Sequence, residues 1–388
     1  MKALAGIIVT AAVLLAAGGA YVARRITAAS FARRYPLRLL GVVRSSDGAP
    51  MVLVDGANAP TPDGHYSLRL APPAGAAERI VPVGARAPFS GADRRGWVIN
   101  PADASALNEA RRASWSGVMF ESPRAAGLAA RDVSIPTPAG AAPAWLISPN
   151  SPSGVWAIHV HGLGSGREGT LRGVLAAQRQ HMTSLVVTYR NGAGGPRTRG
   201  GRSTLGVGET SDVVSAIAYA RESGATRVVL FGWSMGAAIC LRAAHDPSGA
   251  GLVGALVLES PIIDWRAAIR ANLRHAHLPA QALTAAEPWL QRRPLARLIG
   301  LTQPISLDSL DWISRTKELV TPTLILHGSA DWSAPIGASR ELAARNAHVQ
   351  LEEFTAGHTL TWNSDPERWD ELVDAWLARH GGAAAPRM

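Results

Sequence analysis

The sequence predicts an α/β fold with a mostly parallel sheet and helices on both of its faces. Two observations support this prediction. From about residue 132 onward, short apolar runs typical of strands alternate with segments of helical periodicity. Residues 228–241 read VVLFGWSMGAAICL, so an apolar strand passes through a glycine–serine turn directly into an Ala-rich helix. A chain that alternates in this way places parallel strands side by side and packs the intervening helices against them.

The predicted elements of this sheet follow one another along the chain. Strands are expected at Asp132–Ile135, Ala144–Ser148, Val155–His161, Ser184–Tyr189, Arg227–Phe231, Ala255–Leu258, Thr323–Leu326 and Val349–Phe354. Helices are expected at Thr170–Gln180, Thr210–Ser223, Ala237–His245, Ala338–Asn346 and Pro366–Arg379.

Composition divides the chain into four predicted regions. Residues 1–30 form an N-terminal anchor or signal peptide with a linker, and residues 31–131 form a small β-rich accessory region. Residues 132–380 form the α/β domain, and residues 381–388 form a disordered tail. Within the α/β domain, residues 262–320 depart from the carboxyl ends of the strands, where binding determinants of such sheets lie. We expect this excursion to be a lid.

The accessory region and the lid have predicted elements of their own. In the accessory region we expect strands at Leu37–Arg44, Val52–Val54, Tyr66–Leu70 and Trp97–Ile99, tight turns at Asp47-Gly48, Asp55-Gly56 and Asp63-Gly64, and a short helix at Asn108–Arg112. In the lid we expect amphipathic helices at Trp265–His275, Leu283–Gln291 and Leu307–Trp312.

The N-terminus carries an uncharged stretch from residue 3 to residue 23, and its 21 residues are enough to span a bilayer as a helix. It predicts a single-pass membrane anchor. The alternative is a signal peptide cleaved near the small residues Gly18-Gly19-Ala20, which would make the protein secreted. Five arginines follow the stretch and favour a cytoplasmic location for the rest of the chain.

Charge and cysteine content exclude some classes of function. The formal net charge is +10, and nearly all the basic residues are arginines scattered among Ala and Gly. No basic run interleaved with aromatic residues is present, so nucleic-acid binding is not expected. Cys240 is the single cysteine, and its apolar neighbours indicate a core residue. No oligomeric state can be assigned from the sequence.

The turn at residues 232–236 has the features of a nucleophile elbow. Ser234 stands between Gly232 and Gly236, after a strand and before a helix. Glycines are needed on both sides because a side chain there would collide with the neighbouring strand and helix. The turn exposes the hydroxyl of Ser234. It also places the N–H of Met235 at a helix N-terminus, where partial positive charge stabilises an oxyanion.

A serine hydroxyl needs a base, and the elbow predicts an acid and then a histidine later in the chain. Asp331 lies in a loop after one predicted strand, and His358 lies in a loop after the last. His358 is expected to take the proton of Ser234, and Asp331 is expected to orient the imidazole. Glu259, just after an earlier strand, is the alternative acid.

A second oxyanion donor is expected in the glycine-rich loop after the strand Val155–His161, and the backbone N–H of Leu163 is the candidate. The remaining histidine pairs give only a weak zinc signal, because they lack the companion ligands of a metal site. These pairs are His159 with His161 and His275 with His277. We therefore expect no metal.

Six segments resemble the α/β-hydrolase superfamily and occur in its order. They are HVHGLGSGREGTLR, VVTYRNGAGG, VVLFGWSMGAA, LVLESP, LILHGSADWSAP and AGHTLTW. The chain is most similar to the branch of prolyl-oligopeptidase-like catalytic domains and small serine esterases. The resemblance covers about residues 132–379 and implies an eight-stranded sheet, the roles given above for the serine, acid, histidine and oxyanion donors, and no cofactor.

The predicted activity is hydrolysis of a small-molecule carboxylic ester or thioester through an acyl-enzyme on Ser234. Peptidase or amidase activity of the same residues is an alternative, as is a non-catalytic binding module on the same fold. The sequence specifies neither the substrate nor its chain length.

Overall fold

The computed structural model describes residues 2–30, 33–45, 47–55, 64–73, 78–87, 94–249 and 251–382, with only the backbone described for residues 2–13. The chain forms two compact units. The first contains residues 1–31, 130–359 and 371–388, and the second contains residues 32–129 and 360–370. Two of the predicted turns, Asp55-Gly56 and Asp63-Gly64, lie partly outside the described residues, as does the predicted tail from residue 383 onward.

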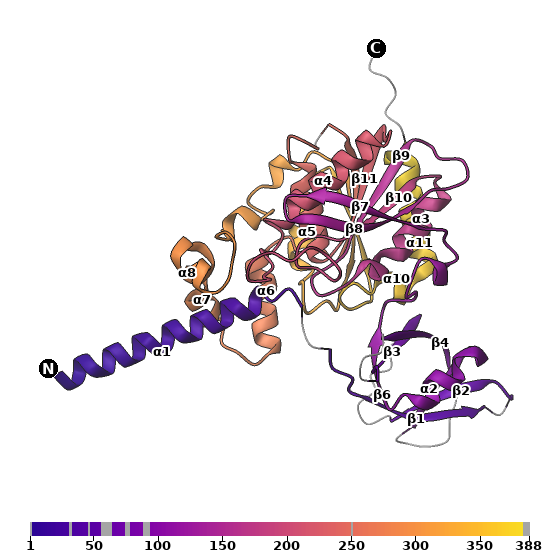
Figure 1. Ribbon diagram of the computed structural model, residues 1–388, viewed down its shortest axis with the longest axis horizontal. Coiled ribbons are helices and arrows are strands. Elements are labelled where there is room, and N and C mark those ends of the chain that lie inside the picture. Colours follow the sequence, from indigo (N-terminus) through magenta and orange to yellow (C-terminus); the bar gives the residue numbers. More distant parts are fainter. Residues whose placement is uncertain are drawn as a thin grey trace, which may run out of the picture. The chain divides into compact units, whose positions relative to one another are not determined.

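The first unit is built on an eight-stranded sheet (Figure 1). Its strands are β7 (Arg131–Thr137), β8 (Gly140–Ile147), β9 (Val155–Val160), β10 (Thr183–Val187), β11 (Arg227–Trp233), β12 (Val253–Glu259), β13 (Thr323–Gly328) and β14 (Val349–Phe354). They lie in the order β14-β13-β12-β11-β9-β10-β8-β7. All neighbours from β14 to β10 are parallel, whereas the β10–β8 and β8–β7 pairs are antiparallel. The predicted mostly parallel sheet is confirmed.

Helices cover both faces of this sheet (Figure 1). The helices of the first unit that accompany the sheet are α3 (Leu171–Arg179), α4 (Glu209–Glu222), α5 (Met235–Ala244), α9 (Gly337–Arg345) and, from residue 371 onward, α11 (Pro366–His380). The short helix α10 (Thr361–Ser364) belongs to the second unit. On one face Arg179 of α3 pairs with Asp374 of α11 at 2.7 Å. On the other face α4 lies beside α5.

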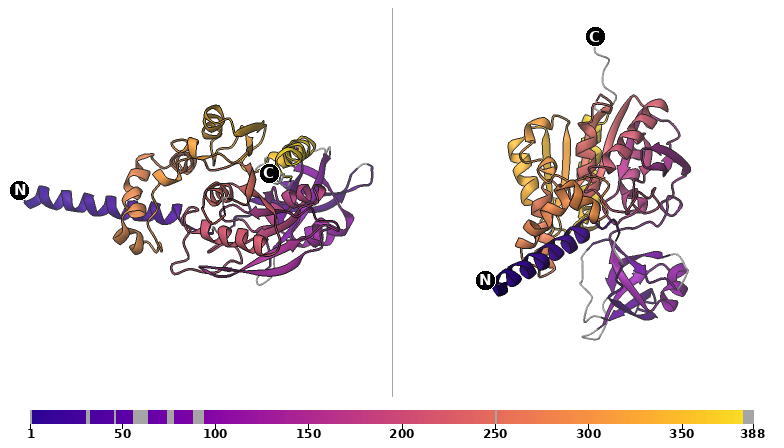
Figure 2. Two further views of the ribbon diagram at one scale, coloured as in Figure 1. Left: turned by 90° about the horizontal axis from the view of Figure 1, so that it is seen from above. Right: turned by 60° about the vertical axis from the view of Figure 1, so that its left-hand side comes forward.

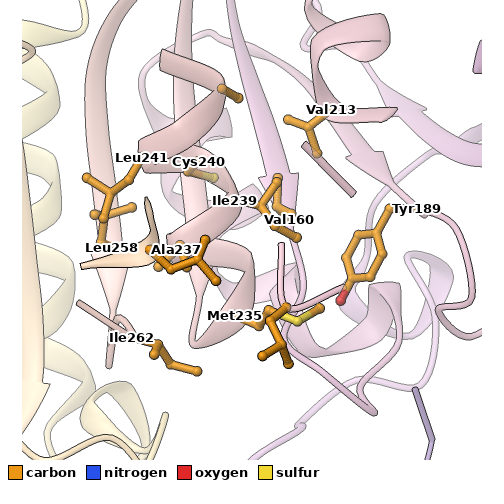
Figure 3. Close-up of a cluster of buried hydrophobic side chains, with 14 of the residues drawn as sticks. Val160, Tyr189, Val213, Met235, Ala237, Ile239, Cys240, Leu241, Leu258 and Ile262 are labelled. Atoms are coloured by element: carbon orange, nitrogen blue, oxygen red, sulfur yellow. The ribbon is translucent and has the colours of Figure 1, made fainter. Parts of the chain in front are cut away.

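The core of the first unit surrounds α5, which follows the predicted elbow. Figure 3 shows Met235, Ala237 and Ile239 of α5 in one buried cluster with Val160 of β9 and Leu258 of β12. Small and aliphatic side chains allow α5 to approach the sheet closely. The helix that begins at the serine turn is therefore fixed by packing along its length.

The excursion after β12 is helical. It contains α6 (Trp265–His275), α7 (Gln281–Gln291) and α8 (Arg293–Leu298), followed by the 3₁₀ turns Asp308–Leu310 and Thr316–Glu318. A helix is expected at Leu307–Trp312, but only the single 3₁₀ turn Asp308–Leu310 forms there, so this prediction is wrong for the rest of the segment. Asp311 ends that turn, because its backbone is extended and its side chain accepts the N–H of Ile313 at 2.9 Å.

The N-terminal helix α1 (Lys2–Ile26) runs alongside α7 (Figure 2). A Cβ atom at Gly19 would lie 2.1 Å from the carbonyl oxygen of Ala285, so the two helices are in backbone contact. Val22 and Ala23 are buried in the core of the first unit.

The structure contradicts the prediction of an N-terminal membrane anchor. Across the described residues, none of the helices combines the length and the apolar character that crossing a bilayer requires. The single-pass membrane location predicted from residues 3–23 is therefore wrong. At the end of this uncharged stretch, Val22 and Ala23 are buried in the protein, whereas Tyr21 is exposed.

The second unit contains a closed six-stranded barrel with the strand order β1-β2-β5-β4-β3-β6. The strands are β1 (Leu37–Arg44), β2 (Pro50–Asp55), β3 (Tyr66–Leu70), β4 (Arg79–Ala87), β5 (Arg94–Ile99) and β6 (Arg112–Ser116), with helix α2 (Ala104–Glu109) between the last two. The predicted helix at Asn108–Arg112 is wrong, because α2 ends at Glu109 and β6 begins at Arg112. Barrel closure removes the exposed strand edges that an open sheet would leave.

Candidate active site

Ser234 occupies a sharp turn between β11 and α5. Its backbone angles are φ 53° and ψ −116°, a conformation that a residue with a side chain rarely adopts. The backbone N–H of Ser234 donates to the carbonyl of Glu259 at 2.9 Å, which ties the turn to the end of β12. The serine side chain is directed by a strained backbone that neighbouring elements hold in place.

The glycines around Ser234 are required by close backbone approach. A Cβ at Gly232 would lie 2.5 Å from the Cα of Ala237, and one at Gly236 would lie 2.1 Å from the carbonyl oxygen of Val160. A Cβ at Gly162 would lie 3.3 Å from the Cβ of Ser234, so the loop after β9 passes beside the serine.

His358 connects Ser234 with Asp331. Its Nε2 lies 2.9 Å from the Oγ of Ser234, and its Nδ1 lies 2.7 Å from Oδ2 of Asp331. An ionised carboxylate only accepts hydrogen bonds, so Nδ1 carries the proton and Nε2 accepts from the serine hydroxyl. The three predicted side chains thus form one continuous hydrogen-bonded chain.

Asp331 is held by donors on both of its oxygens. Oδ1 accepts the backbone N–H groups of Ser333 at 2.9 Å and Ala334 at 2.8 Å. Burial alone would raise the pKa of Asp331, but hydrogen bonds from His327, His358 and the Ala334 N–H outweigh it and hold this pKa well below its ordinary range. Asp331 is therefore ionised at neutral pH.

Sequence reasoning missed His327, which supports the loop of Asp331. The fully buried imidazole donates from Nε2 to the carbonyl of Ala334 at 2.8 Å, and this nitrogen also lies 3.3 Å from Oδ2 of Asp331. Its Nδ1 accepts the hydroxyl of Ser339 at 2.9 Å. The sequence offers only a histidine four residues before the acid, and no pattern indicates that the two side chains meet.

Glu259, the alternative acid, binds other partners. Its Oε2 accepts the indole N–H of Trp233 at 2.8 Å, and its Oε1 accepts from Arg172 at 3.0 Å. The imidazole of His358 is paired with Asp331 instead. Geometry therefore favours Asp331 as the acid that orients His358.

The loop after β9, which carries Leu163, passes beside the serine at Gly162. The hydroxyl of Tyr189 donates to the carbonyls of His161 and Gly162, each at 3.0 Å. The Nδ1–H of His161 also donates to the Gly162 carbonyl, at 2.9 Å, and its ring stacks on Tyr189. Burial lowers the pKa of His161, which keeps this supporting imidazole neutral.

His159 and His275, from the two predicted pairs, make contacts of their own, and His277 is exposed. His159 is buried, and its Nε2 lies 3.1 Å from the hydroxyl of Ser184 on the neighbouring strand. Burial lowers the pKa of His159 to about 3. His275 stacks on Trp332, with ring centroids 3.8 Å apart. Throughout the part of the chain with described side chains, no group of three or more His, Cys, Asp or Glu is placed to hold a metal ion.

Comparisons with known proteins agree with this architecture. Residues 157–375 match the family described as "Alpha/beta hydrolase family". Two crystal forms of the Pyrococcus furiosus esterase Pf2001 superpose with a TM-score of 0.53 at 20% and 19% identity, over 67% of this chain and 95% and 96% of theirs. An esterase from Thermogutta terrifontis is 19% identical over 64% of this chain and 98% of its own, with a TM-score of 0.45.

Comparison with curated proteins finds no match. The structural likeness to Pf2001 supports the fold, and the family match covers more than half of the chain. The chain therefore belongs to the alpha/beta hydrolase family and is a hydrolase.

Proposed function

We propose that the protein is a serine hydrolase that cleaves small-molecule carboxylic esters or thioesters through an acyl-enzyme on Ser234. The observation that carries this proposal is the hydrogen-bonded chain from Ser234 through His358 to Asp331, with separations of 2.9 and 2.7 Å. The name of Pf2001, an esterase, supports the choice of an ester among the substrates open to this family.

In the first step the Oγ of Ser234 attacks the carbonyl carbon of the ester while Nε2 of His358 takes the hydroxyl proton. Asp331 keeps the other ring proton on Nδ1 and stabilises the imidazolium that forms. Its lowered pKa suits this role, because an ionised carboxylate must face the developing positive charge.

The negative charge on the carbonyl oxygen requires two donors. Met235 is the first residue of α5, so its N–H has no acceptor within the helix and lies at the positive end of the helix dipole. The N–H of Leu163 is the proposed second donor, on the loop that passes beside Ser234. The imidazolium of His358 then returns its proton to the leaving oxygen or sulfur.

Water completes the cycle. His358 takes a proton from a water molecule, and the resulting hydroxide attacks the acyl carbon. As the tetrahedral intermediate collapses, the bond from the acyl carbon to Oγ breaks and the imidazolium of His358 returns its proton to Oγ, which releases the acid and regenerates Ser234.

We further propose that residues 262–320 act as a lid that contributes to substrate choice. Two contacts join α6 to the loop of Asp331. The side-chain amide of Asn272 donates to the carbonyl of Ser333 at 2.8 Å, and His275 stacks on Trp332.

A panel of p-nitrophenyl esters with increasing acyl length, assayed beside thioesters and peptide amides, tests the proposed chemistry. We expect ester turnover with a burst of p-nitrophenol equal to the enzyme concentration where deacylation is slower than acylation. Amide cleavage exceeding ester cleavage would instead support the peptidase alternative. Binding of these compounds without turnover would support a non-catalytic module.

A further inference from the structure

The end of β12 contacts both loops of the proposed triad. Glu259 accepts the backbone N–H of Ser234 with its carbonyl, and accepts the indole N–H of Trp233 at 2.8 Å with its side chain. The hydroxyl of Ser260 accepts the backbone N–H of Thr359 at 3.0 Å. Glu259 thus binds Trp233, which precedes the nucleophile. The adjacent Ser260 binds Thr359, which follows the base.

Arg172 of α3 completes the connection. Its Nη2 donates to Oε1 of Glu259 at 3.0 Å and to the carbonyl of Thr359 at 2.8 Å. Both backbone polar groups of Thr359 are therefore engaged, the N–H by Ser260 and the carbonyl by Arg172. Because Thr359 directly follows His358, these bonds restrict where the imidazole can lie.

Two residues in these contacts, Ser260 and Thr359, have an unfavourable backbone conformation. Ser260 has φ 46° and Thr359 has φ 55°, both in the left-handed region. A β-branched residue such as Thr359 enters that region only where its surroundings fix it. Arg172 and Glu259 are only 7% and 1% exposed, so water and salt screen their interaction weakly.

We propose that Arg172 and Glu259 are positioning residues that hold His358 within hydrogen-bonding distance of Ser234. This inference rests on the proposed function, because it assigns a role in the same reaction. Glu259 acts through Arg172 and Trp233 and takes no proton from His358. The alternative is that the buried ion pair only stabilises the fold.

Three variants separate these possibilities. Arg172→Met removes both hydrogen bonds, Glu259→Gln removes the negative charge, and Arg172→Lys keeps a charged donor as the conservative rescue. Glu78→Gln is the matched control, because Glu78 pairs with buried Arg69 at 2.5 Å in the second unit. It makes the same Glu-to-Gln change at an ion pair with a buried arginine, remote in the chain from the triad.

The first measurement is the rate constant for phosphonylation of Ser234 by a fluorophosphonate, together with kcat and KM for p-nitrophenyl acetate. Both rates are normalised to the fraction of reactive serine, so unfolded protein does not contribute. We expect Arg172→Met and Glu259→Gln to lose about 10- to 100-fold in phosphonylation rate and kcat, with KM within about threefold of the wild type. Arg172→Lys should recover part of the loss, and Glu78→Gln should stay within about twofold.

The second measurement does not depend on activity. The proton on Nδ1 of His358, hydrogen-bonded to Asp331, is expected to give a low-field ¹H NMR resonance that disappears in Asp331→Asn. In Arg172→Met we expect this resonance to shift or broaden, because His358 is no longer fixed, whereas Glu78→Gln should leave it unchanged. A purely stabilising pair would lower the fraction of folded protein and leave the resonance of the folded fraction unchanged.

The outcomes distinguish the two proposals. Wild-type rates per reactive serine and an unchanged resonance in Arg172→Met would overturn the positioning role while leaving the serine hydrolase intact. If the wild-type protein neither reacts with the fluorophosphonate nor turns over esters, the proposed function fails. The resonance would then still show whether Arg172 fixes His358.

Discussion

The Nε2 atom of His358 lies 2.9 Å from the Oγ of Ser234, although 124 positions separate the two residues in the chain. Ser234 follows β11, Asp331 follows β13 and His358 follows β14. These strands are parallel, so their carboxyl ends meet at one edge of the sheet.

Replacing Ser234 with Ala should abolish the covalent pathway. We expect kcat for p-nitrophenyl esters to fall by about 10⁴- to 10⁶-fold, because the remaining groups supply only binding and oxyanion stabilisation. Ser215→Ala, on α4, is the control and should keep wild-type turnover. Ester turnover in Ser234→Ala within tenfold of the wild type would remove Ser234 from the mechanism.

The two acids should differ in their effect on turnover. Asp331→Asn is expected to lower kcat by about 10⁴-fold, because the amide no longer orients the imidazole or stabilises its cation. Glu259→Gln should lower kcat by a smaller factor, because Glu259 contacts Arg172 and Trp233, whereas His358 is paired with Asp331. Steady-state kinetics of both variants check the assignment. A larger loss in Glu259→Gln than in Asp331→Asn would reverse it.

His327→Phe tests the support of the acid loop. The change removes the N–H that donates to the Ala334 carbonyl and lies 3.3 Å from Asp331. We expect the free energy of unfolding, measured in urea at pH 7, to fall by about 1–3 kcal/mol. The pKa of Asp331 should rise in this variant, because one of the hydrogen bonds that lowers it is lost. Unchanged stability and unchanged acid sensitivity would contradict this role.

The lowered pKa of Asp331 also predicts how stability depends on pH. The unfolded chain protonates this residue near its ordinary pKa of about 4, whereas the native carboxylate stays ionised to lower pH. The unfolded state therefore binds more protons below about pH 4, and the free energy of unfolding falls as the pH is lowered there. Urea titrations should show a weaker decline in Asp331→Asn. Parallel pH profiles for the two proteins would contradict the contribution of Asp331.

Gly236→Ala tests the close approach at the elbow. A methyl group there would lie 2.1 Å from the Val160 carbonyl oxygen and 2.6 Å from that of His161, and backbone atoms cannot move aside cheaply. We expect a loss of about 3 kcal/mol or more in the free energy of unfolding, together with loss of activity. Gly337→Ala, where a methyl group meets nothing within 4 Å, is the matched control and should be neutral or slightly stabilising. Equal stability of the two variants would contradict the close backbone packing at Gly236.

The sequence predicted the sheet and the elbow because their signals are local. The run from Val228 to Ala237 contains a strand, a turn and a helix start within ten residues, and chain order then pointed to Asp331 and His358. Contacts between distant residues left no such signal. Arg172 meets Glu259 across 87 positions, and nothing in either neighbourhood indicates the other.

The N-terminal stretch shows a second limit of prediction from sequence. An uncharged helix has the same composition whether lipid or protein covers it, and here protein covers Val22 and Ala23 at its end. In the barrel, β4 carries Arg79, Gly84 and Arg86, which weakened its strand pattern. The strand forms because pairing with β3 and β5 closes the barrel.

The most direct test of the central claim is to map the site of fluorophosphonate modification by peptide mass spectrometry in the wild-type protein and in Ser234→Ala. We predict one adduct, on Ser234, that forms in parallel with the loss of ester hydrolysis and is absent from the variant. Full hydrolytic activity after stoichiometric modification of Ser234, or inactivation by modification of another residue with Ser234 untouched, would contradict it.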